Sequence, residues 1–486
     1  MSRPLQDLLS RLTDIRVLVL GDLVLDEYVV GESSRISSEA PVPVVQFQSQ
    51  HAVLGGAANT AANVAALGGS VTLIGLVNAD DAAGREIARQ CAAASIRLIG
   101  IDDGRPTTRK VRVMGQQQQL LRLDYESVDE IRRDIEERAR REFAREVAHA
   151  DIVVISDYAK GFMTAGLCQE VIALAHARGT AVVIDPRPQH AAFYTHCDYL
   201  TPNWKESQAL LGRPEVAATT EMVESTGRLL SAQFHCSVLL TLGSRGIAFF
   251  PRDGGAHFTV SASAREVFDV SGAGDTVVAA FSLASAAGSS PVDAVDFANR
   301  AAGIVVGKRG TATVSAEEFL ASDYREAGLV GRQALRGLCM SFRAKSRRIV
   351  TATGTFDRLG STQLAYLRDA RALGGVLIVG MRSERVARDA SDTPEMSLDG
   401  RSDLLLALRP VDFVHMLEDD DAVRFLEAVR PDVHVAATRR EVTPDEAAAV
   451  ERAGGRVVVI ETMDGGARDG GRADTPALAD RARARP

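Results

Sequence analysis

Short apolar runs alternate with stretches of helical spacing along most of this chain, and this rhythm restricts the fold more than any other feature. The first apolar run is Arg16–Leu20, and similar runs follow at Ile152–Ser156, Ala181–Ile184 and Val238–Leu242. Helix-like stretches such as Ala165–Ala177 lie between them. Strands and helices that alternate at this spacing favour a doubly wound, mostly parallel sheet with helices on both faces. The expected fold class is therefore α/β.

The rhythm is interrupted once and then restarts. The 486-residue length suits two to four domains, and the character of the chain changes at Leu320–Lys345, before a new apolar run at Arg348–Thr353. Four further apolar runs follow, at Val376–Met381, Phe413–Leu417, Val433–Ala436 and Arg456–Glu461. The last residues are rich in Gly, Ala, Arg and Asp without any period. We therefore predict a first domain, a linker, a smaller α/β domain and a disordered tail, at residues 1–325, 326–346, 347–465 and 466–486.

Between the first strands lie segments that suit a separate small sheet. Tyr28–Val30 and Val42–Gln48 alternate like strands, and Val111–Asp124 does the same. The helical stretch Ala57–Leu67 and the apolar run Val71–Leu76 then resume the main rhythm. We expect the alternating segments to form a small β lid over an active site.

Composition excludes several classes of function. Apolar residues make up 46% of the chain and charged residues 25%, and the net charge of −8 argues against a nucleic-acid binder that works by bulk electrostatics. The five scattered cysteines suit reduced, separately buried thiols, and no run of about 18 apolar residues appears. We expect a cytoplasmic enzyme with no nucleic-acid or membrane partner.

The segment Asp269-Val-Ser-Gly-Ala-Gly-Asp275 carries the strongest chemical signal, because an Ala-rich helical stretch follows it at once. Gly272 and Gly274 lack Cβ atoms, so the backbone around Ala273 can turn tightly and bring its N–H groups close to a ligand. A helix N-terminus favours an anion such as a transferred phosphoryl group. Asp275 is then suited to take a proton from an attacking hydroxyl. The alternative is a glycine-rich helix cap with an ordinary first-turn carboxylate.

Two other turns have the residues of a sugar site. Gly55 and Gly56 lead into a helix, and Asn59 in its first turn can donate and accept hydrogen bonds with a sugar hydroxyl. Gly21-Asp22 follows the first strand, at the carboxyl end of the predicted sheet, where α/β folds place ligands. A packing device and an ordinary turn are the respective alternatives.

A further pair of turns suits the nucleotide. Asn203-Trp-Lys-Glu206 follows a Thr-Pro turn, and an Asn and a Glu three residues apart can share one helix face and hold a hydrated Mg²⁺. The alternative is an N-cap Asn with a capping-box Glu. Thr241-Leu-Gly-Ser-Arg-Gly246 is another strand-to-glycine turn, which can cradle phosphates or simply join two strands. The candidate nucleotide contacts in these turns are Asn203, Trp204, Lys205, Glu206, Thr241, Gly243 and Gly246.

Residues from about 14 to 320 resemble the ribokinase-like sugar kinase family, through the Gly55–Asn59 and Asp269–Asp275 motifs. Within that family they resemble the kinase half of bifunctional heptose 7-phosphate kinase/heptose 1-phosphate adenylyltransferases. This narrower resemblance rests on Ser34–Pro43, Arg105–Lys110, Gln117–Arg122, Ser156–Gly161 and Val306–Thr313.

The resemblance implies a ribokinase-like fold and an activity. The implied reaction transfers the γ-phosphate of ATP, with Mg²⁺, to the anomeric hydroxyl of D-glycero-D-manno-heptose 7-phosphate in ADP-heptose biosynthesis. It also implies a homodimer, since members of this family often form dimers. Asn299 joins the candidate nucleotide contacts on the same basis.

A sugar that already bears a phosphate needs cationic partners, and the family-like segments supply four candidates. Each of them taken alone fits a solvated surface charge better than a ligand contact. Asp185-Pro-Arg187 departs from the family, which commonly carries Asp-Pro-Lys, and planar Arg does not simply replace Lys. The candidate phosphate contacts are Arg35, Lys110, Arg122 and Lys160.

Residues from about 348 to 465 resemble the nucleotidyltransferase half of the same enzymes, without its catalytic residues. Where the family has His-x-Gly-His, this chain has Gly360-Ser-Thr-Gln363, and the family's Lys-Gly-Gly-Asp appears as Ala436-Ala-Thr-Arg439. The remaining histidines, His415 and His434, lie in strand-like runs. We expect an inactive domain used in dimer contacts, regulation or docking of a separate adenylyltransferase.

Four alternatives stay open at this point. The first is a kinase for a different sugar or nucleoside, and the second is a non-catalytic sugar-nucleotide sensor or scaffold formed by the whole chain. The third is a second domain that keeps adenylyltransferase activity. In the fourth, Ser361, Thr362 and Arg439 run that reaction differently.

Overall fold

The computed structural model describes residues 3–115, 118–263, 267–308, 310–327, 332–344, 346–357, 359–382, 396–417, 421–437 and 442–460. The chain divides into two compact units, Ser2–Ser322 and Asp323–Pro486, each described by itself below. The predicted tail 466–486 lies outside the described residues. Within the described residues, no helix is both long and apolar enough to cross a membrane.

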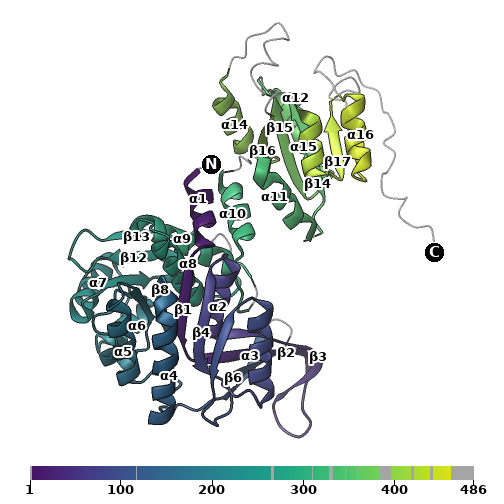
Figure 1. Ribbon diagram of the computed structural model, residues 1–486. Coiled ribbons are helices and arrows are strands. Elements are labelled where there is room, and N and C mark those ends of the chain that lie inside the picture. The colour runs from purple at the N-terminus through teal and green to yellow at the C-terminus, as the bar shows by residue number, and fades with distance from the viewer. Residues whose placement is uncertain are drawn as a thin grey trace. The chain divides into compact units, whose positions relative to one another are not determined.

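A nine-stranded sheet forms the centre of the first unit, in the order β13-β12-β11-β10-β9-β8-β1-β4-β5 (Figure 1). Near one edge β12 pairs antiparallel with both β11 and β13, and all the other neighbouring strands pair parallel. The strands are β1 (Arg16–Gly21), β4 (Ser70–Leu76), β5 (Arg97–Ile101), β8 (Ile152–Ser156), β9 (Ala181–Asp185), β10 (Tyr199–Leu200), β11 (Ser237–Thr241), β12 (Ile247–Phe250) and β13 (Phe258–Val260). The predicted doubly wound sheet is confirmed.

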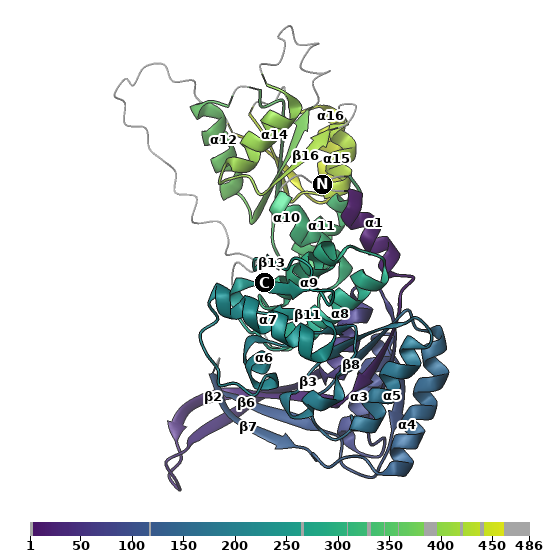
Figure 2. The ribbon, with the colours of Figure 1, turned by 90° about the vertical axis from the view of Figure 1, so that its left-hand side faces the viewer.

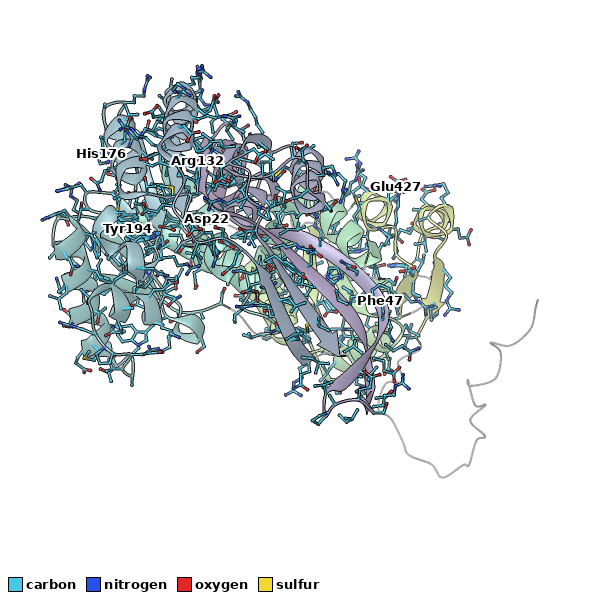
Figure 3. The ribbon with its side chains drawn as sticks, turned by 90° about the horizontal axis from the view of Figure 1, so that it is seen from below. Asp22, Phe47, Arg132, His176, Tyr194 and Glu427 are labelled. Carbon is cyan, nitrogen blue, oxygen red and sulfur yellow. The ribbon has the colours of Figure 1, made fainter. Side chains whose placement is uncertain are left out.

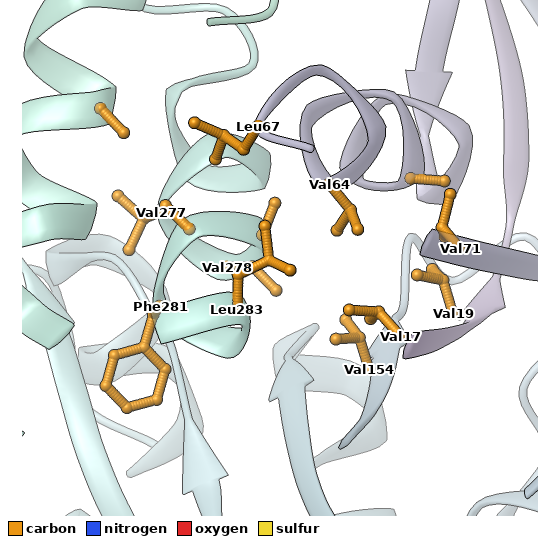
Figure 4. Close-up of a cluster of buried hydrophobic side chains, with 14 of the residues drawn as sticks. Val17, Val19, Val64, Leu67, Val71, Val154, Val277, Val278, Phe281 and Leu283 are labelled. Atoms are coloured by element: carbon orange, nitrogen blue, oxygen red, sulfur yellow. The ribbon is translucent and has the colours of Figure 1, made fainter. Parts of the chain in front are cut away.

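Helices cover both faces of this sheet, because successive side chains of a strand point to opposite sides. Val17 and Val19 of β1 pack into one core, and Leu18 and Leu20 pack into the other. Figure 4 shows the first core, where Val64 of α2 and residues of α8 meet Val17, Val19 and Val154. The helices are α1 (Arg3–Leu12), α2 (Ala57–Ala66), α3 (Ala82–Ala93), α4 (Arg133–Glu146), α5 (Ala165–His176), α6 (Trp204–Leu210), α7 (Thr220–Phe234), α8 (Ala273–Ala286), α9 (Pro291–Val305) and α10 (Ala316–Ala327).

A separate four-stranded sheet, in the order β3-β2-β6-β7, extends away from α4 and α5 (Figure 2). Its strands are β2 (Leu23–Ile36), β3 (Pro43–Gly56), β6 (Arg109–Gly115) and β7 (Gln118–Tyr125). β2 follows β1 after one residue, and β3 runs directly into α2. The small sheet is thus connected to the end of β1 through Asp22 and to the start of α2 at Gly56. The predicted accessory sheet is confirmed.

The second unit is a five-stranded, all-parallel sheet in the order β16-β15-β14-β17-β18. Its core contains Val350, Val379, Val414 and Val435 from four of these strands. The elements are α11 (Arg332–Ala344), β14 (Ile349–Gly354), α12 (Ser361–Ala372), β15 (Val376–Arg382), α14 (Leu398–Ala407), β16 (Phe413–Leu417), α15 (Ala422–Val429), β17 (Val433–Ala436), α16 (Pro444–Arg452) and β18 (Arg456–Val459). A second α/β domain is therefore present, as expected.

The predicted linker at 326–346 needs correction. Most of it is α11, and Leu335, Leu338, Cys339 and Phe342 on that helix are buried. The ring of Phe342 lies 5.7 Å from that of Phe413 in β16, so the helix packs on the second unit. The basic residues at its end suggested a linker, but apolar residues at helical spacing bury one face.

Candidate active site

Asp275 lies in the first turn of α8 and is only 4% exposed. Gly272, the N-cap, adopts the left-handed φ of 80°, and a Cβ there would lie 2.9 Å from Nδ2 of Asn59. Gly274 is exposed, and a Cβ there would meet no atom within 4 Å, so open space adjoins the first turn of the helix. The helix begins at Ala273, earlier than the Ala-rich run suggested, and its first amides lie beside the carboxylate.

Three side chains donate hydrogen bonds to the Asp275 carboxylate. Asn59 Nδ2 lies 2.7 Å from Oδ2, Tyr158 OH lies 2.8 Å from Oδ1, and Thr60 Oγ1 lies 3.2 Å from Oδ1. Burial raises the pKa of Asp275, while these hydrogen bonds and the charge of Arg187 lower it. The carboxylate is thus held in one orientation.

The sequence predicted Asn59 at this site but assigned no role to Thr60 or Tyr158. Asn59 is predicted to bind sugar, and its amide nitrogen donates to Asp275. Tyr158 lies in the Ser156–Gly161 segment that carried the family resemblance, which was the available signal for it. Thr60 directly follows Asn59 on α2. Its position beside Asn59 in the predicted helix was the available signal for it.

Asp22 and the glycine pair join the two sheets of the first unit. The Asp22 carboxylate is 3% exposed and accepts hydrogen bonds from the backbone N–H groups of Tyr158, Lys160 and Phe162. Burial raises its pKa to about 6, and the charge of Asp157 adds to this. Asp22 therefore holds a turn of its own chain, and Figure 3 shows it where the two sheets meet.

Gly55 and Gly56 permit close contacts of the backbone at the same junction. A Cβ at Gly55 would lie 2.5 Å from Oδ2 of Asp26, and one at Gly56, whose φ is 57°, would lie 2.5 Å from the carbonyl oxygen of Asp22. Both glycines are buried. These close contacts fit the alternative in which the glycine pair is a packing device. The predicted sugar contact of the pair stays a prediction.

Arg187, named only as a departure from the family, lies among charged and aromatic groups of the site. Its guanidinium stacks 4.4 Å from the ring centroid of Tyr158 and pairs with the Glu206 carboxylate. Burial raises the pKa of Asp185 well above its ordinary value, and the charge of Glu206 adds to this, whereas Arg187 opposes it. Arg187 therefore offsets several neighbouring carboxylates.

The four candidate phosphate contacts divide into two pairs. Lys110 lies over the Tyr158 ring at 5.8 Å, and burial lowers its pKa while the charge of Lys160 adds to this. Lys160 is partly buried and pairs with Glu126 at 2.7 Å. Arg35 and Arg122 are exposed, and Arg122 pairs with Asp124 in its own strand. Lys110 thus lies over the ring of Tyr158, whose hydroxyl contacts Asp275, and the charge of Lys160 acts on Lys110.

Asn203 and Glu206 form the helix cap that was the alternative to a metal site. Asn203 Oδ1 accepts a hydrogen bond from the Glu206 N–H, and Glu206 Oε2 accepts one from the Asn203 N–H. The other carboxylate oxygen of Glu206 pairs with Arg187, so these two residues do not fit a direct Mg²⁺ site. Within the described residues, no group of three or more His, Cys, Asp or Glu side chains is placed to hold a metal.

The remaining nucleotide candidates lie on three elements. Trp204 Nε1 donates to the carbonyl oxygen of Val216, and Lys205 is exposed. Thr241 ends β11, and the following turn has Gly243 at φ 60° and Gly246 at φ 93°. Asn299 on α9 is 6% exposed and donates to the carbonyl oxygen of Ser261. The structure shows no direct contact that joins these residues to Asp275.

The second unit lacks imidazoles at the end of its first strand. Gly360 is the N-cap of α12, and Gln363 Oε1 accepts the Gly360 N–H at 3.0 Å. His434 lies in β17 and contacts Thr351, and burial lowers its pKa to about 4. His415 in β16 stacks on Phe425. Both histidines are buried, while Arg439 lies outside the described residues.

Comparison with known proteins shows which family the chain is similar to. Residues 14–318 match the pfkB family carbohydrate kinases. The bifunctional protein HldE of Geobacter metallireducens is 35% identical over 472 residues, which cover 95% of each chain. The bifunctional protein HldE of Pseudomonas aeruginosa is 38% identical over 474 residues, which cover 94% of this chain and 96% of that protein. These relatives span both units, so the comparison does not support a separate adenylyltransferase as partner.

Solved structures show the same fold for the first unit. Ribokinase of Arabidopsis thaliana, solved with ribose and ATP, aligns with a TM-score of 0.50 at 23% identity. Phosphofructokinase-2 of Escherichia coli, solved with fructose-6-phosphate, aligns with a TM-score of 0.52 at 19% identity. Each alignment covers 63% of this chain and 97% of the other. The chain belongs to the pfkB family of carbohydrate kinases and is a sugar kinase with the ribokinase-like fold.

Proposed function

We propose that this kinase transfers the γ-phosphate of ATP to the anomeric hydroxyl of D-glycero-D-manno-heptose 7-phosphate, giving the 1,7-bisphosphate of ADP-heptose biosynthesis. The observation that carries the proposal is similarity to proteins named HldE along nearly the whole chain. The heptose-kinase segments between Ser34 and Thr313 support the same substrate. A kinase for another sugar or sugar phosphate is the alternative.

Asp275 is the base in this proposal. Its carboxylate lies at the N-terminus of α8, beside the open space in front of Gly274. A sugar hydroxyl in that space would give its proton to Asp275 as it attacks phosphorus. The amides of Gly272, Ala273 and Gly274 would stabilise the charge on the transferred group. ATP brings Mg²⁺ on its phosphates, and that ion and the nucleotide contacts of α6, β11 and α9 remain predictions.

Lys110 and Lys160 are the proposed partners of the 7-phosphate. The two lysine ammonium groups repel each other, and both are partly buried. A phosphate dianion bound between them would offset this repulsion. Arg35 and Arg122 are less suited in this conformation, because both are exposed. The small sheet would thereby bind the phosphorylated end of the sugar through Lys110.

A panel of free and phosphorylated sugars assayed with ATP tests the substrate. We expect turnover of the heptose 7-phosphate and little turnover of the free heptose. Lys110→Ala should raise KM for the sugar phosphate about tenfold and leave KM for ATP unchanged, because it removes one charge-assisted contact. Arg133→Ala, which removes a surface charge on α4, is the control. Preference for a non-phosphorylated sugar would contradict the proposal.

Arg187→Lys restores the residue that the family commonly has and tests whether this site depends on the planar guanidinium of Arg187. We expect kcat to fall about tenfold, since an ammonium neither stacks flat on Tyr158 nor pairs with Glu206 through a planar fork. Arg89→Lys breaks a comparable but exposed pair with Glu86 and should keep full activity. Wild-type kcat in the Arg187 variant would show that only charge matters at this position.

For the second unit we propose an inactive nucleotidyltransferase-like domain with a role in dimer contacts or regulation. The residues that support this are Gly360 and Gln363, which stand where the resembled enzymes have histidines. The names of the relatives favour the alternative, a bifunctional enzyme with a working second unit.

A further inference from the structure

The turn between β8 and α5 is held in one shape by two buried carboxylates. Asp22 accepts the N–H groups of Tyr158 at 2.8 Å and Lys160 at 3.1 Å. Asp157, which is fully buried, accepts the N–H of Ala159 at 2.7 Å. Ala159 has a φ of 52°, a conformation that residues with a Cβ adopt only when their surroundings fix it.

A second set of contacts behind the turn fixes Asp157 itself. Tyr194 OH donates to Asp157 Oδ2 at 2.7 Å, and His190 Nδ1 lies 2.7 Å from the same oxygen. Tyr194 also accepts the backbone N–H of Arg187 at 2.9 Å. The turn and the backbone of Arg187 are therefore held by one network.

The side chain that this turn presents to the site is Tyr158. Its hydroxyl donates to Asp275 Oδ1 at 2.8 Å, and its ring lies under the Arg187 guanidinium. Burial and the charge of Asp275 hold the pKa of Tyr158 well above its ordinary value. Tyr158 is therefore a neutral hydrogen-bond donor throughout the working pH range.

We propose that Tyr158 is a positioning residue of the phosphoryl-transfer site, whose hydroxyl holds the Asp275 carboxylate in the orientation that accepts a proton. The inference rests on the proposed role of Asp275 as the base. Without the Tyr158 hydroxyl, Thr60 Oγ1 at 3.2 Å is the remaining side-chain donor to Oδ1 within the part of the chain that the structure describes. Oδ2 keeps Asn59.

The groups around Asp275 give the direction of a pH effect. Helix α2 contributes Asn59 and Thr60 and has no charged residue. Asp185 ends β9, and its negative charge repels the ionised Asp275 carboxylate. Arg187, two residues later, carries a positive charge that stabilises the ionised Asp275. The Tyr158 hydrogen bond stabilises the ionised form of Asp275, so its loss should raise the pKa of the base.

The test is the pH dependence of kcat/KM for D-glycero-D-manno-heptose 7-phosphate with saturating ATP, measured for the wild type and Tyr158→Phe. The variant keeps the ring under Arg187 and loses one oxygen. We expect the acid limb of the profile to move up by about one pH unit, the usual effect of one hydrogen bond to a charged group. Activity below the limb should then fall about tenfold. KM for ATP should not change.

Two further variants separate tuning of the base from a loss of folding. Incorporation of 3-fluorotyrosine at position 158 supplies a stronger donor of nearly equal size and should move the limb down. Tyr366→Phe removes a buried hydroxyl that donates to the Val435 carbonyl oxygen in the second unit, and it should leave the profile unchanged. A thermal unfolding curve for each variant identifies any general loss of stability.

The outcomes distinguish this inference from the function on which it rests. A wild-type acid limb in both position-158 variants overturns the role of Tyr158, provided that Asp275→Asn is inactive. An active Asp275→Asn variant instead contradicts the proposed base. If the wild type does not turn over the heptose 7-phosphate, the substrate proposal fails, and the same profiles are measured with the sugar that the panel identifies.

Discussion

Asp275→Asn is expected to lower kcat by about 10²–10⁴-fold, the usual contribution of a general base. The amide that replaces the carboxylate has almost the same size, but it cannot accept the proton of the sugar hydroxyl at neutral pH. Asn59, Thr60 and Tyr158 would still surround the side chain. We therefore expect ATP binding, measured by calorimetry, to change little.

Asp293→Asn is the matched control for this substitution. Asp293 lies in the first turn of α9, as Asp275 does in α8, and its carboxylate accepts a hydrogen bond from the hydroxyl of the N-cap Ser290 at 2.6 Å. It should keep wild-type kcat. Equal activity of the Asp275 and Asp293 variants would show that Asp275 is an ordinary first-turn carboxylate and that the proton leaves by another route.

The second unit is expected to release no pyrophosphate above background when the full chain is incubated with heptose 1-phosphate, ATP and Mg²⁺. Loss of one group that stabilises developing charge typically costs 10²–10³-fold in rate. The imidazoles of the resembled enzymes are absent at both 360 and 363. Gln363 is neutral, and its oxygen already accepts the N–H of Gly360 at the start of α12.

The Pseudomonas aeruginosa protein named as bifunctional is the positive control for pyrophosphate release. Kinase turnover in the same preparation of the present protein shows that its first unit is active. Steady release at a rate comparable to that of the control would mean that the second unit works with different residues. Ser361 and Thr362, at the start of α12, would then be the first positions to substitute.

Local sequence pattern was sufficient for most strands and helices of both units. The predicted runs Ile152–Ser156, Phe413–Leu417 and Val433–Ala436 are the observed β8, β16 and β17. Buried parallel strands are short and continuously apolar, so their bounds are visible without any partner. Around Arg332–Ala344 the pattern was misread, because a basic helix end next to a new strand resembles a linker.

What the sequence determined by itself is the pair of α/β units, the small sheet and the Gly-Ala-Gly-Asp turn at a helix start, because these depend on period and on local backbone chemistry. Only the tertiary structure decided which side chains share the site. Asn59, Tyr158 and Asp275 come from distant parts of the chain, and strand order brings them together. It also showed Asp22 holding a turn and Glu206 capping a helix, since hydrogen-bond partners depend on which donors lie within about 3 Å in space.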